Sequence, residues 1–174
     1  MANAHHRPQG FTMIELVVVI SILAILSGVI VPRVNSHMKA SRDAERLAHV
    51  KTLRSAIDQF HMDRGSYPVA DSSSTSGGWD VSNDGNFIQV LAESGYITEE
   101  LVDPINDGRY HYRYYVYESG AYGCSGDRPF FVLGIRHFES HEFANRHRGF
   151  FRCPGRNWGN EFAFVTGGGA GFSE

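Results

Sequence analysis

The sequence predicts an α+β protein in which a long N-terminal helix packs on a small antiparallel sheet of three to four strands. Two patterns carry this prediction. An apolar stretch of membrane length is followed by apolar residues at helical spacing from Leu47 to Phe60, whereas later segments contain short runs of strand-forming residues between turn signals. With 174 residues, the chain has room for one domain and one anchoring segment.

Residues 10–32 form an apolar stretch of membrane length, GFTMIELVVVISILAILSGVIVP. A helix from Phe11 to Val31 spans about 32 Å, which is enough to cross a bilayer. The stretch is rich in Val and Ile, but a helix is favoured because an isolated strand leaves its backbone groups unpaired in lipid. Gly28 and Pro32 lie four residues apart, and proline removes a helical hydrogen bond, so we expect a kink there.

One charged residue, Glu15, interrupts this stretch. A carboxylate in lipid costs several kcal/mol unless it is paired, so we expect a positive partner. Cleavage between Gly10 and Phe11 would create one, because it leaves an α-amino group on Phe11, four residues before Glu15 and on the same helix face. The amine of a neighbouring chain could serve equally well.

The residues GFTMIE followed by an apolar helix resemble the leader junction of type IV pilins and type II secretion pseudopilins. The resemblance implies that residues 1–10 are a leader removed by a prepilin peptidase, that Phe11 is N-methylated, and that residues 11–32 form the transmembrane and assembly helix. It also implies a homo-oligomeric filament and an inner-membrane assembly platform as partners. The alternatives are a plain signal anchor and a cleaved secretory signal peptide.

The helix is expected to continue through residues 33–64 as an amphipathic segment, with an apolar stripe of Leu47, Val50, Leu53, Ile57 and Phe60. Gly65 ends it, and the sequence Asp63 to Pro68 resembles the D-x-G-x-Y-P stretch of many pseudopilins. Residues 65–174 are then expected to form a pilin-like head with a variable C-terminal part.

Within the head we expect a polar loop over residues 71–86 and a short helix over residues 87–97. Period-two alternation predicts a strand over residues 110–117, and two further strands are expected over residues 130–138 and 161–166. The glycine-rich tail from Gly167 is expected to be flexible. The resemblance covers roughly residues 8–135.

The charges after the apolar stretch conflict with the topology that the resemblance implies. Five bases follow the stretch, namely Arg33, Lys39, Arg42, Arg46 and Lys51, and the positive-inside rule would place them in the cytoplasm. The leader junction and the two cysteines favour the opposite orientation. We therefore expect a single-pass inner-membrane protein whose head is periplasmic or extracellular.

Cys124 and Cys153 are the only cysteines, and an even count outside the cytoplasm predicts a disulfide. Major pseudopilins bind calcium in the head, and Asp80, Asn83 and Asp84 supply the oxygen ligands that calcium prefers. Their spacing is not that of an EF-hand, so ordinary turn residues are the alternative. Asp103, Asn106 and Asp107 form a second group of this kind.

No catalytic motif is present, and we expect no enzymatic activity and no cofactor other than calcium. His137 and His141, with Glu139 and Glu142, could be imagined as a zinc site, but they lack the His-Glu-x-x-His order. The net charge of −3 makes nucleic-acid binding unlikely as a main function.

The predicted function is therefore a structural subunit of a type IV pilus-like or type II secretion pseudopilus filament. Two alternatives remain: a monomeric membrane-anchored periplasmic binding protein, and a minor type IV pilin used in adhesion or DNA uptake.

Overall fold

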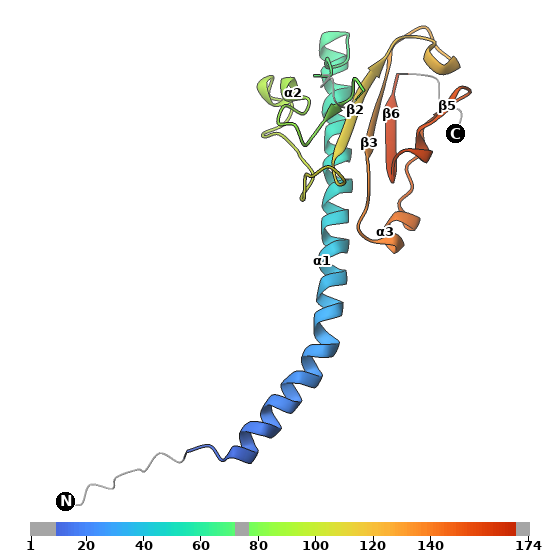
Figure 1. Cartoon of the computed structure of the whole chain (residues 1–174). Coiled ribbons are helices and arrows are strands. Elements are labelled where there is room, and N and C mark those ends of the chain that lie inside the picture. The colour runs from blue at the N-terminus through green and yellow to red at the C-terminus, as the bar shows by residue number, and fades with distance from the viewer. Residues whose placement is uncertain (1–9, 72–76, 170–174) are drawn as a thin grey trace, which may run out of the picture. The chain divides into compact units, whose positions relative to one another are not determined.

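The computed structural model describes residues 10–71 and 77–169 of the chain (Figure 1). Two compact units, Met1–Met38 and Lys39–Glu174, share one long helix, α1, which runs over Met13–Arg64. The predicted helix, expected from Phe11 to about Asp63, is confirmed within one or two residues. Its backbone is helical through Gly28 and Pro32, and the kink expected there stays a prediction.

The second unit contains a four-stranded antiparallel sheet in the order β1-β2-β3-β6. The strands are β1 (Asp80–Val81), β2 (Tyr112–Tyr117), β3 (Phe130–Ile135) and β6 (Phe164–Gly168). The sheet confirms the predicted α+β class. In the register of β2 and β3, Tyr112 lies opposite Ile135 and Tyr117 opposite Phe130.

One face of the sheet packs on the amphipathic part of α1. The predicted stripe is buried: Val50, Leu53 and Ile57 are fully inaccessible to solvent, and they join Tyr112 and Tyr114 of β2 in one core. Residues 112 and 114 lie on the same face of the strand because successive side chains alternate. The periodicity of the sequence therefore identified both halves of this core.

A second core covers the opposite face of the sheet. The C-terminal segment folds back over β3 and supplies Phe151, Trp158 and Phe162, which pack with Phe130 and Val132. All six residues of β3 are buried as a result, which explains why this strand reads as a continuous apolar run. The segment contains α3 (His141–Arg146), the short strands β4 (Arg152–Cys153) and β5 (Arg156–Asn157), and 3₁₀ turn η3 (Trp158–Asn160).

Several predicted elements differ from the structure. The polar segment expected to be a loop contains β1, because Trp79 and Val81 are buried and β1 pairs with β2. The helix expected over residues 87–97 is reduced to α2 (Gln89–Glu93), since Ile88 adopts a left-handed conformation (φ 43°) just before it. A 3₁₀ turn, η2 (Ala121–Gly123), follows β2.

The third predicted strand was placed too early, and the tail was wrongly predicted as flexible up to Gly169. β6 includes Gly167 and Gly168, which are buried. A Cβ atom on Gly167 would lie 2.2 Å from the Phe151 ring and 2.3 Å from the Phe131 carbonyl oxygen. Only glycine therefore fits between β3 and the C-terminal segment at this position.

Candidate functional site

Glu15 lies in the first turn of α1, and its carboxylate is held by Thr12. The Thr12 amide and hydroxyl both donate to Glu15 Oε2 at 2.8 Å, and the Glu15 amide donates back to Thr12 Oγ1 at 3.3 Å. This reciprocal arrangement is a capping box, which satisfies amide groups that the start of a helix leaves without intrahelical partners. The signal was present in the sequence as Thr-x-x-Glu before an apolar run, but sequence reasoning missed it.

The residues at the expected cleavage junction are accessible. Gly10 and Phe11 precede the helix and are exposed, and the side chain of Phe11 is 86% exposed. The preceding leader residues 1–9 lie outside the described residues. A protease could therefore reach the bond between Gly10 and Phe11 without unfolding α1.

The N-terminal part of α1 presents a continuous apolar surface. Among the described residues, it is the one helix that is long and apolar enough to cross a membrane, and the most apolar 18-residue window of that helix is fully exposed. The exposed apolar side chains of this part include Ile14, Leu16, Val17, Val18, Ile20, Leu23, Ile25, Leu26 and Val31. A surface of this size is too apolar to remain in water and needs a bilayer or neighbouring helices to cover it.

Two of the five bases that follow the apolar stretch are bound inside the head. Arg46 is fully buried, and its guanidinium donates to both oxygens of Asp103, at 2.7 and 2.9 Å. It also donates to Asp43 at 2.7 Å and to Glu139 at 2.9 Å. Arg42 forms a second bidentate pair with Glu139, at 2.6 and 2.7 Å.

This network connects three parts of the chain. Asp43 accepts backbone amides of Glu139 and Ser140, so α1 is tied to the loop after β3 as well as to the segment before β2. The hydrogen bonds from Arg42 lower the pKa of Glu139 to about 2, which keeps that carboxylate charged. The network therefore fixes the position of the sheet along the axis of α1. No local sequence pattern indicated this role.

The three residues considered for calcium are not assembled as ligands. Asp80 is fully buried, and its Oδ2 accepts the amides of Asp71 and Ile88 at 3.0 and 3.1 Å, whereas Asn83 and Asp84 are exposed. Asp80 Oδ1 has no hydrogen-bond partner among the described residues, and burial raises the pKa of this carboxyl to about 7. Asp80 therefore acts as an anchor for the loop around β1.

The other metal candidates are likewise used for structure. No group of three or more His, Cys, Asp or Glu residues that could hold a metal ion occurs within residues 10–71 and 77–169. In the second oxygen-rich group, Asp103 is paired with Arg46, and Asp107 accepts the amides of Arg109 and Tyr110. Glu139 and Glu142, which are close to His137 and His141 in the sequence, form ion pairs with arginines.

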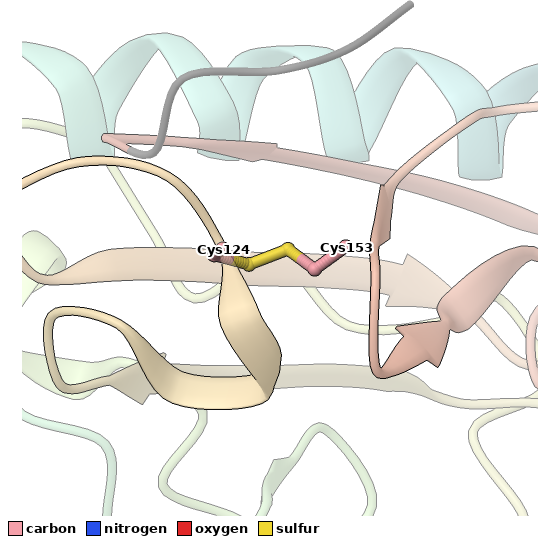
Figure 2. Close-up of a disulfide and its surroundings, with 2 residues drawn as sticks. All are labelled: Cys124 and Cys153. Atoms are coloured by element: carbon pink, nitrogen blue, oxygen red, sulfur yellow. A yellow bond between two sulfur atoms is a disulfide. The ribbon is translucent and has the colours of Figure 1, made fainter.

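Cys124 and Cys153 form the predicted disulfide, which Figure 2 shows joining the segment after η2 to β4. Their Cα atoms are 4.9 Å apart, and both residues belong to the second core. The bond holds the C-terminal segment onto the outer face of the sheet, beside Trp158 and Phe130.

Residues 5–31 match the family described as the prokaryotic N-terminal methylation motif. The chain is 32% identical over 63 residues to the type II secretion system core protein G of Pectobacterium carotovorum subsp. carotovorum, covering 36% of this chain and 40% of the relative. It is 36% identical over 62 residues to the type II secretion system core protein G of Pseudomonas aeruginosa, covering 36% and 44%. It is also 31% identical over 96 residues to a fimbrial protein of Neisseria meningitidis, covering 53% and 55%.

These matches span about half the length of the curated relatives or less, and no solved structure matches the chain significantly. The motif and the relatives confirm the predicted resemblance to type IV pilins and type II secretion pseudopilins. None of these relatives is named as an enzyme, in agreement with the non-enzymatic prediction.

Proposed function

We propose that this chain is a structural subunit of a type IV pilus-like or type II secretion pseudopilus filament. It is made as a precursor, cut between Gly10 and Phe11 by a prepilin peptidase, and N-methylated on Phe11. The observation that carries the proposal is Glu15, a lone carboxylate in the first turn of a helix whose apolar surface is exposed.

The hydrogen bonding of Glu15 leaves room for the proposed partner. Both Thr12 donors reach Oε2, and no donor from residues 10–71 or 77–169 reaches Oε1. In a bilayer, Oε1 would therefore still lack a partner, which is costly in a medium without water. The free amine of Phe11, from the same or an adjacent subunit, supplies the missing positive charge.

Assembly then follows from how α1 is divided. Residues 39–64 are committed to the head through the first core, whereas none of the apolar side chains before Met38 that the structure describes belongs to that core or is buried. Leaving the bilayer, these segments bundle with their copies in neighbouring subunits and form the filament core. Gly28 and Pro32 mark the point at which this helix loosens during that transfer.

The proposed location is the inner membrane, with one span and a periplasmic or extracellular head. The disulfide between Cys124 and Cys153 supports an oxidising compartment for the head. Arg42 and Arg46 have structural roles in the head, which gives a reason for their position after the span despite the positive-inside rule. The implied partners are the prepilin peptidase, an inner-membrane assembly platform and further copies of the chain.

The test combines processing and assembly in the producing cell. N-terminal sequencing of the native product should begin at a methylated Phe11, and Gly10→Val should leave the precursor uncut. Glu15→Ala should be processed normally but yield few or no sheared filaments, whereas Glu118→Ala, which removes an exposed head carboxylate, should assemble normally. Normal filament yield from Glu15→Ala would refute the pairing argument. An uncut N-terminus without sheared filaments would instead indicate a monomeric membrane-anchored binding protein.

A further inference from the structure

The charges of the head are divided between two consecutive segments. The segment Gly65–Gly108 contains eight acidic residues and no Lys, Arg or His. The segment Arg109–Arg156 contains eight arginines, four histidines and four acidic residues. A chain with a net charge of only −3 therefore carries two strongly charged and opposite parts.

The fold places β1, from the acidic segment, at one edge of the sheet and the C-terminal part of the basic segment near the other edge, with β2 and β3 of the basic segment between them. The acidic segment forms β1, at one edge of the order β1-β2-β3-β6, together with α2. The C-terminal part of the basic segment supplies α3, β4 and β5, and Gly149 and Phe151 of this part lie against Val165 and Gly167 of β6. Figure 1 shows α2 on one side of α1 and β5 and β6 on the other.

Most of these charges form no ion pair with another residue that the structure describes. Among the described residues, no cationic side chain forms an ion pair with Asp71, Asp84, Glu93 or Glu99, all of which are exposed. In the same part of the chain, six arginines of the basic segment form no ion pair: Arg109, Arg113, Arg128, Arg136, Arg148 and Arg152. Arg136 even lowers the pKa of Arg113, in addition to the larger effect of burial, so like charges are held close together.

The basic surface is also concave. A recess of about 340 Å³ is lined by His141, Asn145, Arg148 and Phe162, and no carboxylate lines it. A neighbouring recess of about 240 Å³ shares His141 and adds Arg109 and His137, and its one carboxylate, Glu139, is already paired with Arg42 and Arg46. These hollows suit a protruding acidic side chain.

We propose that the acidic edge of one head, around Glu99, docks on the basic edge of a second copy of this chain, around Arg148. The partner is a second copy of this chain, because every copy carries both the acidic edge and the basic edge and the two are complementary in charge. A two-fold dimer through either edge would bring like charges together, so the contact must be head-to-tail. A head-to-tail contact that does not close into a ring extends without limit. The inference goes beyond the proposed function because it concerns the heads alone and does not depend on Glu15.

The experiment uses the full-length chain in detergent micelles, with Thr98→Cys and Asn145→Cys introduced together. Both positions are exposed, next to Glu99 and in the recess respectively. Mild oxidation should give a ladder of covalent trimers and larger species at low salt. Either cysteine alone should give no species above a dimer. The ladder should persist with Glu15→Ala, which separates this contact from the proposed assembly site.

Charge reversal then tests the pairing. Glu99→Arg or Arg148→Glu alone should reduce the ladder about three- to tenfold, because an attractive pair becomes a repulsive one. The two together should restore it, which also shows that each variant folds. The controls Glu118→Arg and Arg128→Glu reverse exposed charges elsewhere on the head and should leave the ladder unchanged. Raising the salt concentration to 0.5 M should weaken the unmodified contact. A ladder indifferent to reversal and to salt, a failure of the double reversal to restore it, or efficient dimers from Thr98→Cys alone would overturn the proposal.

Discussion

Arg46 on α1 and Asp103, in the segment before β2, form a bidentate ion pair in which neither side chain is exposed to solvent. The two residues are 57 positions apart, and the Arg46 guanidinium also lies 4.9 Å from the centre of the Tyr110 ring. A buried guanidinium is tolerated here because the carboxylates of Asp43, Asp103 and Glu139 all accept hydrogen bonds from it. The pair joins the long helix α1 to the segment that leads into the sheet.

Removing Arg46 should destabilise the head severely. In Arg46→Met the volume is roughly kept, but Asp43, Asp103 and Glu139 lose a shared cation in a buried site. We expect a loss of about 3–5 kcal/mol in the free energy of unfolding. Urea denaturation of the full-length chain in micelles, followed by the fluorescence of Trp79 and Trp158, measures it.

The matched control is Arg146→Met, which removes an exposed ion pair with Glu142 on α3. Exposed pairs of this spacing contribute about 0.3–0.5 kcal/mol. Equal effects of the two substitutions would contradict a structural role for the buried network.

The capping box predicts a distinct role for Thr12. Thr12→Ala removes the hydroxyl that donates to the Glu15 carboxylate and accepts from the Glu15 amide. Loss of such a cap costs about 0.5–2 kcal/mol of helix stability. Amide hydrogen exchange of residues 13–16 in micelles should accelerate accordingly. Thr12→Ser keeps a hydroxyl and should exchange nearly as slowly as the unmodified chain. Fast exchange in both variants would show that the hydroxyl does not hold this turn.

The parts of the fold that the sequence predicted are those whose patterns are local. The stripe of α1 repeats every three to four residues, and the alternation of β2 is read from neighbouring side chains, so both could be found without knowing their partners. β3 does not alternate in this way, because both of its faces are buried and its apolar run is unbroken.

The missed elements are those that depend on distant residues. β1 consists of only Asp80 and Val81 and exists because β2 pairs with it. β6 uses Gly167, which β propensity disfavours, because the Phe151 ring occupies the space of a side chain. At the candidate site, Glu15 was identified from its charge alone, whereas the partners of Arg46 come from separate segments that no spacing rule connects.

Asp80 predicts an unusual dependence of stability on pH. Burial raises the pKa of its carboxyl to about 7, against an ordinary value of 3.8, with Asp84 and Asp71 adding negative charge nearby and the amides of Asp71 and Ile88 opposing the shift. The folded chain therefore keeps a proton that the unfolded chain has lost, and this contribution to stability declines as the pH rises from about 4 through 7. Asp80→Asn removes it.

The difference in unfolding free energy between Asp80→Asn and the unmodified chain should therefore change between pH 5 and pH 8. From pH 5 to pH 8, the unfolding free energy of Asp80→Asn should rise relative to that of the unmodified chain by on the order of 2–3 kcal/mol, since one pKa unit corresponds to about 1.4 kcal/mol. The variant and the unmodified chain are compared at each pH because His111 also makes stability depend on pH. The pKa of His111 is lowered mainly by burial and also by Arg113, so its contribution to stability rises with pH, whereas that of Asp80 declines. A difference that is constant across this range would show that Asp80 is charged in the folded chain.

The disulfide should stabilise the head by holding the C-terminal segment in place. Cys124 and Cys153 are 29 positions apart, and closing a loop of this length removes unfolded-state entropy equivalent to about 3–4 kcal/mol. The double variant Cys124→Ser and Cys153→Ser should unfold at a correspondingly lower urea concentration, and a reducing agent should shift the unmodified chain in the same direction but leave the variant unaffected. Because the first core on α1 does not contain either cysteine, the variant should retain the helical signal of α1 while the Trp158 environment loosens first. If loss of the bond instead left the urea midpoint unchanged, the packing of Phe151 and Trp158 alone would be sufficient to hold this segment.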